Sequence, residues 1–404
     1  RWIVPHFEKM LTDQALLVRA YLRAWQLTGR GSYLQVVRET IDFVSTALWD
    51  DGFCSSLDAD AGGVEGSHIT WTPDEVAHVL DAAGLDGARE VCEWYGITGP
   101  GNFDGRSIPH RPPGAQLERP HEIEVARRAL LDARLGRLQP TRDDKVLTEW
   151  NAMFIAALAE AASATADDAW ASRAGQAAEL LFQGSRRADG RWMRARSGDV
   201  PAFAADYAWL VECCCKMAEL TGRSVWGQRA EEIGEAMLDL FADDHGTLRT
   251  VGRDSEVLYI QPLDFVDGAV PSANAIGAQA LVRAGALTGS RRLSEAGERI
   301  VERARRLAAS DPIAVADLLP AIAMAAVGVE IVVSGERPDL RDVVRRHWRP
   351  DAVFAWGEPA PSPLWEGKQP GRAYVCRHFS CLEPAADAEV LESQLLRVVA
   401  GHQG

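Results

Sequence analysis

Histidine and carboxylate side chains lie close together near the start of the chain, in a pattern that suits acid–base chemistry. His6 and Glu8 come just before a helical stretch, and Asp13 follows within its first turns. An imidazole titrates near neutral pH, and a nearby carboxylate can orient it as a general acid or base. The pattern therefore predicts His6 and Asp13 as catalytic residues and Glu8 as a substrate-binding residue. A purely structural histidine at a helix entry is the alternative.

A second group of carboxylates follows in a glycine-rich segment. Asp58 and Asp60 would face the same side of an extended chain, and Glu65 lies five residues further on. Two carboxylates placed on opposite sides of a sugar bond can hydrolyse it. Trp71 adds an aromatic face on which the apolar side of a sugar could stack. We expect these four residues to bind substrate, with loop capping by the carboxylates as the alternative.

Polar residues recur at one height on several predicted helices. Asp13, Asn151, Asp206 and Asn274 lie 14 or 15 residues before the Thr that ends each helix. We expect them to converge on one mouth of a shared cavity, with Asp206 as a third catalytic residue. Asp and Asn also favour the first turns and caps of helices, which is the alternative. The remaining predicted substrate-binding residues are Trp2, Asp144, Lys145, Trp150, Asn151, Tyr207, Ser272 and Asn274.

A short repeated turn indicates which elements position these side chains. Leu-Thr-Gly occurs at 27–29, 220–222 and 287–289, and a degenerate Ala-Thr-Ala occurs at 164–166. Each copy lies between two stretches with helical periodicity, so each predicts a helical hairpin closed by a tight link. Stacked hairpins that close on themselves enclose a central cavity. The sequence thus predicts an all-α fold, an α/α toroid over residues 1–330.

Two segments depart from this pattern. Residues 49–119 are rich in Gly, Pro and Asp and alternate like a strand at 67–71, so we expect an inserted β-hairpin with short helices that acts as a lid. Residues 331–404 begin with a strand pattern followed by a helical one, which predicts a small C-terminal α/β appendage.

Composition limits the possible partners. The chain has 404 residues, a formal net charge of −15 and 47% hydrophobic residues. An acidic chain is unsuited to binding nucleic acid or anionic lipid, and we see no apolar run long enough for a membrane span. The seven cysteines are scattered, which favours a reducing cytosol and a cytoplasmic protein; the run Cys213–Cys215 suits small apolar packing. No metal or cofactor is expected.

Longer motifs connect the chain to a known family. They are residues 2–11, 58–60 with 65–66 and 71–72, 101–105, 143–151, 206–208, 271–274, and 375–376 with Cys381. In these motifs the chain resembles the spermatogenesis-associated protein 20 family, which includes YyaL-like thioredoxin-domain-containing proteins. The resemblance implies a toroid like that of six-hairpin glycosidases and N-acylglucosamine 2-epimerases. It also implies a thioredoxin-like domain upstream in full-length relatives and a toroid that is incomplete at its N-terminus.

Two classes of function remain open. The first is a carbohydrate-binding or carbohydrate-modifying protein that acts on a small sugar derivative as an epimerase, isomerase or glycosidase. The second is a non-enzymatic, redox-associated partner that docks clients for the thioredoxin-like domain. The spacing of Cys376 and Cys381 differs from that of a CxxC redox pair, which weakens a redox role for this part of the protein.

Overall fold

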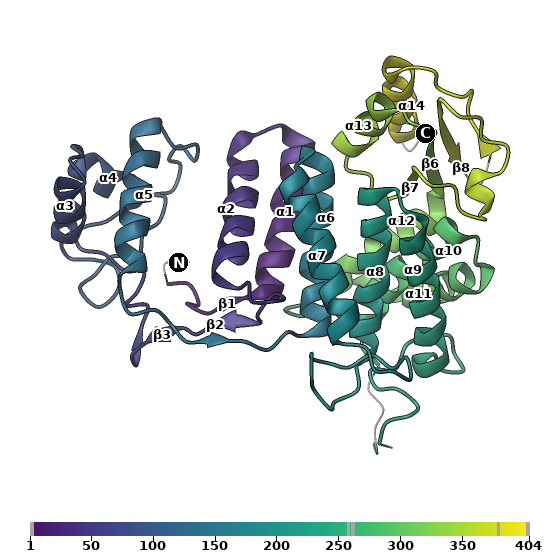
Figure 1. Ribbon diagram of the computed structural model, residues 1–404, viewed down its shortest axis with the longest axis horizontal. Helices are drawn as coiled ribbons and strands as arrows, with labels where there is room; N and C mark the ends of the chain where they lie inside the picture. The colour runs from purple at the N-terminus through teal and green to yellow at the C-terminus, as the bar shows by residue number, and fades with distance from the viewer. Residues whose placement is uncertain (1–3, 257–258, 260–262, 378–379, 401–404) are drawn as a thin grey trace.

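The computed structural model describes residues 4–256, 259, 263–377 and 380–400, and most of these residues build two layers of helices. An inner layer runs through the chain in order, each helix packing against the next, and an outer layer covers it (Figure 1). The inner helices are α1 (Leu11–Thr28), α6 (Thr148–Thr165), α8 (Ala204–Thr221), α10 (Ala273–Thr288) and α12 (Leu319–Val327). The outer helices are α2 (Gly31–Ala47), α7 (Asp168–Gly184), α9 (Ser224–Phe241) and α11 (Arg291–Ser310). The expected α/α toroid is thereby confirmed, as an arc of hairpins.

The Thr-Gly links end the inner helices by local chemistry. In α1 the Oγ1 of Thr28 donates to the carbonyl of Ala24 at 2.6 Å, and Gly29 then takes a left-handed conformation with φ of 69°. The same threonine bond and left-handed residue close α6, α8 and α10. In the degenerate copy the left-handed residue is Ala166, at φ of 55°. A glycine adopts this backbone without steric cost, which is why the turn recurs in the sequence.

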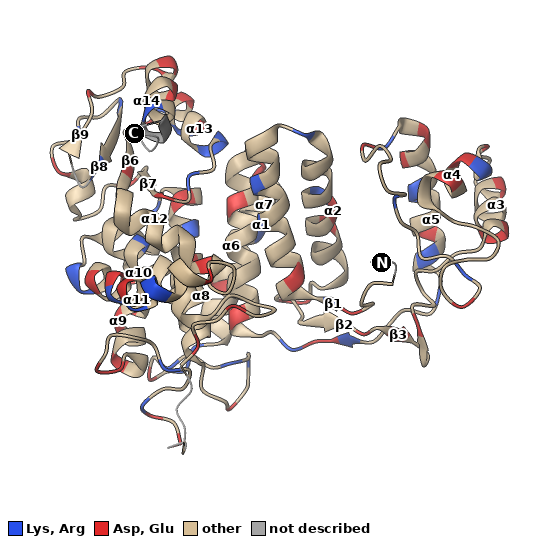
Figure 2. Ribbon diagram, turned by 180° about the vertical axis from the view of Figure 1, so that it is seen from behind, with Lys and Arg blue, Asp and Glu red and all other residues tan. Residues whose placement is uncertain are grey.

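Burial varies along the inner layer and is highest in α6, α8 and α10. Most residues of α8 and nearly all residues of α10 are buried, because each of these helices has neighbours in both layers. Charged residues crowd onto peripheral elements such as α4 (Ala88–Tyr95) and α11, whereas the inner helices are mostly uncharged (Figure 2). Despite this apolar character, no helix in the described part of the chain is both long and apolar enough to cross a membrane.

Two asparagines anchor the long connectors to the starts of inner helices. The side-chain amide of Asn151 accepts from the backbone N–H of Phe53 at 3.0 Å and donates to the carbonyls of Phe53 and Leu147. Asn274 does the same with the N–H and carbonyl of Leu248 at the equivalent position of α10. Each side-chain amide thus bonds both the backbone N–H and the carbonyl of one buried connector residue, as a neighbouring β-strand would do. This explains why Asn occupies the same height in two repeats.

A small three-helix unit lies beside the first hairpin. It consists of α3 (Pro73–Ala82), α4 and α5 (His121–Leu135), packed around a hydrophobic cluster of their own. Both ribbon views place it to one side of α2, away from the inner helices, so the segment does not cover the arc as a lid would (Figures 1 and 2). The strand expected at residues 67–71 is wrong, since residues 67–69 form turns. The hairpin comes earlier, in β3 (Asp60–Ala61) and β4 (Val64–Glu65).

Three very short strands tie this unit to the arc. They pair in the order β1-β2-β5 and consist of β1 (Lys9–Met10), β2 (Ser56–Leu57) and β5 (Arg142–Asp143). The chain before the first hairpin and the chain on both sides of the three-helix unit therefore meet at one sheet. That sheet lies at the long-connector end of the helices, where the N-terminal site residues were predicted.

The C-terminal segment forms the expected small α/β appendage. Its four-stranded sheet has the order β7-β6-β8-β9, with β6 parallel to β7 and antiparallel to β8. The elements are β6 (Val329–Ser334), α13 (Pro338–Arg346), β7 (Ala352–Trp356), the 3-10 turn η2 (Pro363–Trp365), β8 (Arg372–Arg377), β9 (Ser380–Cys381) and α14 (Ala388–Ala400). One face of the sheet packs on α13 and α14, and the other joins the core of the helical arc. The appendage therefore covers the Thr-Gly end of the inner helices.

Candidate functional site

The inner helices carry buried charges one and two turns before their Thr-Gly links. The positions nine and five residues before each Thr are Arg19 and Arg23 on α1, Ala156 and Glu160 on α6, Glu212 and Lys216 on α8, and Gln279 and Arg283 on α10. Residues four positions apart lie on the same face of a helix, so the two positions of each pair share one face. All but one of these side chains are polar, although the helices around them are apolar. This repetition marks a common polar layer inside the arc.

Salt bridges connect the layer across four helices. Arg19 makes a two-pronged contact with Glu160, at 2.8 and 2.9 Å, and reaches Glu212 at 3.1 Å. Glu212 also pairs with Arg283, and both side chains are at most 4% exposed. Lys216 lies 3.5 Å from Glu160 and 2.8 Å from Glu219. Such charges are stable inside a protein only when each finds a partner.

The network fixes the ionisation of its carboxylates. Burial alone would raise the pKa of Glu160, but the adjacent Arg19 and Lys216 outweigh it and hold that pKa well below its ordinary value. The pKa of Glu212 is likewise lowered, since Arg283, Lys216 and Arg19 together overcome the effect of burial. Both groups are therefore carboxylates at neutral pH. They can accept hydrogen bonds from hydroxyls but hold no proton to give.

A cavity of about 110 Å³ opens where this layer meets the C-terminal appendage. This volume is several times what one water molecule requires. The helical side supplies Arg19, Arg23, Glu160, Lys216, Glu219, Gln279 and Arg283, and the appendage supplies Arg345, His347, Trp348 and Arg349. Six Arg or Lys residues but only two carboxylates are among these residues. The cavity is therefore electropositive within an acidic protein.

Two of the cavity arginines, Arg23 and Arg345, have no salt bridge to a carboxylate within the described residues. Within the described residues, no carboxylate lies at salt-bridge distance from Arg23, whose guanidinium lies 5.6 Å from the centre of the Trp348 ring. Burial, reinforced by repulsion from Arg19, lowers the pKa of Arg23. Burial together with the nearby Arg341 lowers the pKa of Arg345 to about 10, and its Nε has no hydrogen-bond partner in the part of the chain described. Both positive charges would be relieved by an anion.

A histidine paired with a carboxylate also lines this cavity. The Nε2 of His347 lies 2.9 Å from Oε1 of Glu392 on α14. A carboxylate at one ring nitrogen fixes the orientation and tautomer of an imidazole. Such a pair is the usual arrangement of a general base. His347 thus supplies a proton-transfer group beside the arginines.

The N-terminal residues predicted to be catalytic do come together, but elsewhere. His6 and Asp13, together with the predicted binding residue Glu8, are exposed at the long-connector end, and Asp13 comes before Arg19 and Arg23 on α1. Burial and the charge of Glu8 raise the pKa of Asp13, while His6 acts in the opposite direction. Their acid–base role stays a prediction. Trp2 lies outside the described residues.

Asp206 and Tyr207 are buried and engaged with protein groups. The carboxylate of Asp206 accepts from the backbone N–H groups of Glu149 and Phe203, at 2.9 and 2.8 Å, and from Arg194 at 2.9 Å. The Tyr207 hydroxyl accepts from Arg191 and from the N–H of Trp192. Arg194 and Glu149 are therefore the charged neighbours of Asp206. Both side chains are thus bound to protein groups, and the catalytic and binding roles predicted for them stay predictions.

The other predicted binding residues lie apart from one another. Asn151, Asn274 and Ser272 are buried at helix starts, where the two amides hold connectors and Ser272 caps α10. Asp58 and Glu65 are exposed, Asp60 accepts from the N–H of Gly63 in a turn, and Asp144 and Lys145 form surface ion pairs. Trp71 is buried in the three-helix unit under Arg137, and Trp150 packs on the main core. The structure therefore does not gather them around one cavity.

Comparison with known proteins adds sequence relatives. No protein-family model matches the chain. It is 28% identical to human spermatogenesis-associated protein 20 in an alignment that covers 96% of this chain and 58% of the relative. The mouse protein of that name is 28% identical over 72% of this chain and 43% of its own length. The resemblance to the spermatogenesis-associated protein 20 family is confirmed.

The similarity to this family is distant but extends along the chain. An uncharacterized protein of Caenorhabditis elegans is 23% identical over 97% of this chain and 61% of its own length. The chain therefore spans less than two thirds of the length of these relatives.

Several solved structures resemble the protein more weakly. Cellobiose 2-epimerase from Spirochaeta thermophila has a TM-score of 0.46 and 13% identity, covering 76% of this chain and 61% of the epimerase. A D-mannose isomerase has a TM-score of 0.40 and 14% identity, covering 74% of this chain and 75% of the isomerase. An unsaturated glucuronyl hydrolase from Bacillus sp. GL1 scores 0.33 at 13% identity, covering 73% and 74%. All three are named as sugar-processing enzymes.

Proposed function

We propose that the protein binds a sugar derivative bearing a negative charge, in the cavity between its inner helices and its C-terminal appendage. The observation that carries this proposal is Arg23, a cation that lines the cavity and has no carboxylate partner among the described residues. An unpaired charge is costly to keep away from water, so its presence favours an anionic ligand. A carboxylate or phosphate on the ligand would supply the missing partner for Arg23 and Arg345.

The rest of the cavity lining suits a sugar. Glu160 and Glu219 are acceptors for hydroxyl groups, Gln279 adds a polar amide, and Trp348 offers an aromatic surface. Sugars are bound in proteins by this combination, because their C–H faces stack while their hydroxyls form hydrogen bonds. A fully apolar ligand would leave these polar groups unpaired.

For the reaction we propose proton transfer, as in an epimerase or isomerase. His347 is oriented by Glu392 and can remove a proton from a carbon next to a carbonyl group. Hydrolysis by paired carboxyl groups needs one of them to be protonated, whereas the arginines and lysine keep Glu160 ionised. The chemistry of the cavity therefore favours isomerisation over glycoside hydrolysis.

The variant Arg23→Gln tests the binding step. We expect it to weaken the binding of an anionic sugar at least tenfold, a loss of about 1.4 kcal/mol. Its melting temperature should match or exceed that of the native chain, because burial and repulsion from Arg19 disfavour the charge of Arg23 more than Glu160, Asp317 and Glu212 favour it. Isothermal calorimetry with glucose, glucose 6-phosphate and glucuronate measures the first effect, and circular dichroism melts measure the second. Arg89→Gln, in an exposed pair with Glu93, is the control.

Equal affinity for charged and neutral sugars, or an affinity unchanged by Arg23→Gln, would contradict the proposed binding site. The catalytic part is checked with the best ligand by following solvent deuterium uptake at its carbons by NMR. His347→Gln should keep binding within about threefold and abolish this exchange. Exchange that continues in His347→Gln would show that another group transfers the proton.

A further inference from the structure

Two cysteines of the C-terminal sheet form a disulfide, contrary to the expectation of a fully reduced set. Cys376 on β8 and Cys381 on β9 are directly opposite each other in the strand pairing, and their sulfur atoms are bonded. The five other cysteines are free thiols, and the run Cys213–Cys215 is buried, as expected for small apolar packing. Burial raises the pKa of all three thiols in this run, which keeps them unreactive. Burial also raises the pKa of Cys54 and of the partly accessible Cys92. Within the described residues, Cys376 and Cys381 are the cysteines that are bonded to each other.

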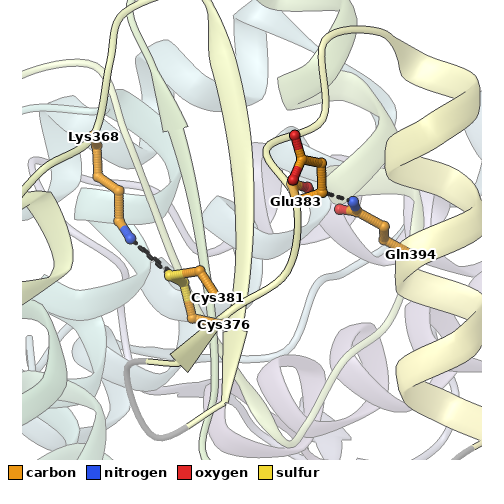
Figure 3. The surroundings of a disulfide bond; sticks show 5 residues. All are labelled: Lys368, Cys376, Cys381, Glu383 and Gln394. Atoms are coloured by element: carbon orange, nitrogen blue, oxygen red, sulfur yellow. Dashed lines mark hydrogen bonds between the residues drawn. A yellow bond between two sulfur atoms is a disulfide. The ribbon is translucent and has the colours of Figure 1, made fainter.

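A lysine is directed at this disulfide. The Nζ of Lys368 lies 2.8 Å from Sγ of Cys381 and 3.5 Å from Sγ of Cys376 (Figure 3). Its side chain reaches there from the loop between η2 and β8, passing the ring of Tyr374. A neutral disulfide gains little from a cation, whereas a thiolate gains a strong charge-assisted contact. The lysine therefore favours the reduced, ionised form of the pair.

The two sulfurs differ in accessibility. Cys381 is an exposed residue on the edge strand β9, whereas Cys376 is 4% exposed and belongs to the core. The chain after β9 is held in place by Gln394 of α14, which donates to the carbonyl of Glu383 at 2.7 Å (Figure 3). An incoming thiol can thus reach the sulfur of Cys381, and the hairpin around it stays anchored.

We propose that the Cys376–Cys381 pair is a dithiol–disulfide exchange site that oxidises a dithiol, with Lys368 stabilising the thiolate that leaves. A thiolate of the dithiol attacks Sγ of Cys381 and forms a mixed disulfide. The Cys376–Cys381 bond breaks, and its electron pair departs with Cys376 as a thiolate facing the ammonium group of Lys368.

The second thiolate of the dithiol then completes the exchange. It attacks the dithiol's own sulfur in the mixed disulfide and releases Cys381 as a thiolate. The dithiol becomes a disulfide, and the protein pair gains two electrons. Cys381 takes up one of the two protons that the dithiol lost, the other goes to solvent, and Cys376 stays a thiolate facing Lys368. No metal or further oxidant is needed. This site is separate from the cavity of the proposed sugar binding and does not depend on it.

The redox equilibrium of the full chain tests this inference. The protein is equilibrated at pH 7 with graded ratios of reduced and oxidised dithiothreitol, alkylated, and mapped at Cys376 and Cys381 by mass spectrometry. We expect Lys368→Gln to require about a tenfold higher ratio of reduced to oxidised dithiothreitol, equivalent to about 30 mV for a two-electron couple. Lys368→Arg should stay within about threefold of the native chain because it keeps the charge. Arg372→Gln, an exposed cation elsewhere on β8, should leave the midpoint unchanged.

Two further measurements separate exchange from a structural disulfide. Circular dichroism in the same buffers should show that reduction occurs in the folded chain. The rate of reduction is then measured with dithiothreitol and with a reduced peptide that contains two cysteines, to identify which class of dithiol the site oxidises. A faster reaction with the peptide indicates a protein dithiol, and a slower one indicates a small-molecule dithiol. Reduction only after unfolding, or identical midpoints for Lys368→Gln and the native chain, would overturn the inference.

Discussion

Replacing Glu212 by alanine should lower the free energy of unfolding by about 3–5 kcal/mol. Glu212 is 1% exposed and pairs with both Arg19 and Arg283, so its removal leaves Arg283 buried and weakly neutralised. Glu219 is the other carboxylate near Arg283, at 3.6 Å from its Nε. Arg19 keeps its contact with Glu160. Guanidine denaturation followed by circular dichroism and by tryptophan fluorescence measures the loss.

A surface ion pair provides the matched control. Glu179 pairs with Arg229 at 2.7 Å, but the two side chains are 46% and 26% exposed. Glu179→Ala should therefore cost no more than about 1 kcal/mol. The double variant Glu212→Leu with Arg283→Leu should be more stable than Glu212→Leu alone, because it removes the stranded cation. If Glu212→Ala costs no more than Glu179→Ala, the buried network does not stabilise the arc.

The hairpin architecture was predictable because its signals are local. The Thr side chain that bonds back one turn and the left-handed residue after it both act within a few positions of the chain. Those interactions need no tertiary contact, so their repetition in the sequence marks the hairpins directly. The α/β appendage was predictable for a similar reason, since Val329–Ser334 is rich in Val and Ile and bounded by glycines.

The site was not predictable from the same kind of signal. Polar residues at the starts of helices suggested a catalytic or binding role. The side-chain amides of Asn151 and Asn274 instead form hydrogen bonds with the backbone of connectors that are distant in the sequence. The charges that do line a cavity lie in the middle of apolar helices, at fixed distances before each Thr. A search for isolated charges in buried helices would have found Arg19 and Arg283, which line the cavity, and Glu212, which pairs with both.

Long-range contacts account for the remaining differences. Nothing local to residues 345–349 indicates that they meet α1 across the cavity. Nothing local to His121–Leu135 separates it from the toroid helices either, although it packs with α3 and α4. Which helix pairs with which is decided by complementary surfaces, and these are visible only once the chain is folded.

The second large effect concerns Asp206 and the pH dependence of stability. Burial raises the pKa of Asp206 from 3.8 to about 7, and Glu149 adds to the rise, while Arg194 and the N–H groups of Phe203 and Glu149 oppose it. Between about pH 4 and 7 the folded chain therefore holds a proton that the unfolded chain has released. The free energy of unfolding should fall as pH rises across this window, by up to about 1.4 kcal/mol per pH unit from this group.

Asp206→Asn should remove this slope, because the amide does not ionise. At pH 5 the variant should be less stable than the native chain by about 1–3 kcal/mol, since the amide nitrogen cannot accept from the N–H of Phe203. The difference should shrink towards pH 8, where the native chain carries a buried charge and the variant does not. Urea denaturation at pH 5, 6, 7 and 8 measures both changes.

The control is Asp167→Asn at the N-cap of α7. Asp167 accepts from the N–H of Trp170 at 3.0 Å, and Asn caps helices as well as Asp does, so this change should leave the pH slope in place. A native slope that persists in Asp206→Asn would assign it to other carboxyl groups, such as Asp317, whose pKa is also raised by burial and by the charge of Asp267. A variant equal to the native chain at pH 5 would show that the three contacts of Asp206 add little to the fold. In either case the buried carboxylate would need a role other than holding the starts of α6 and α8 together.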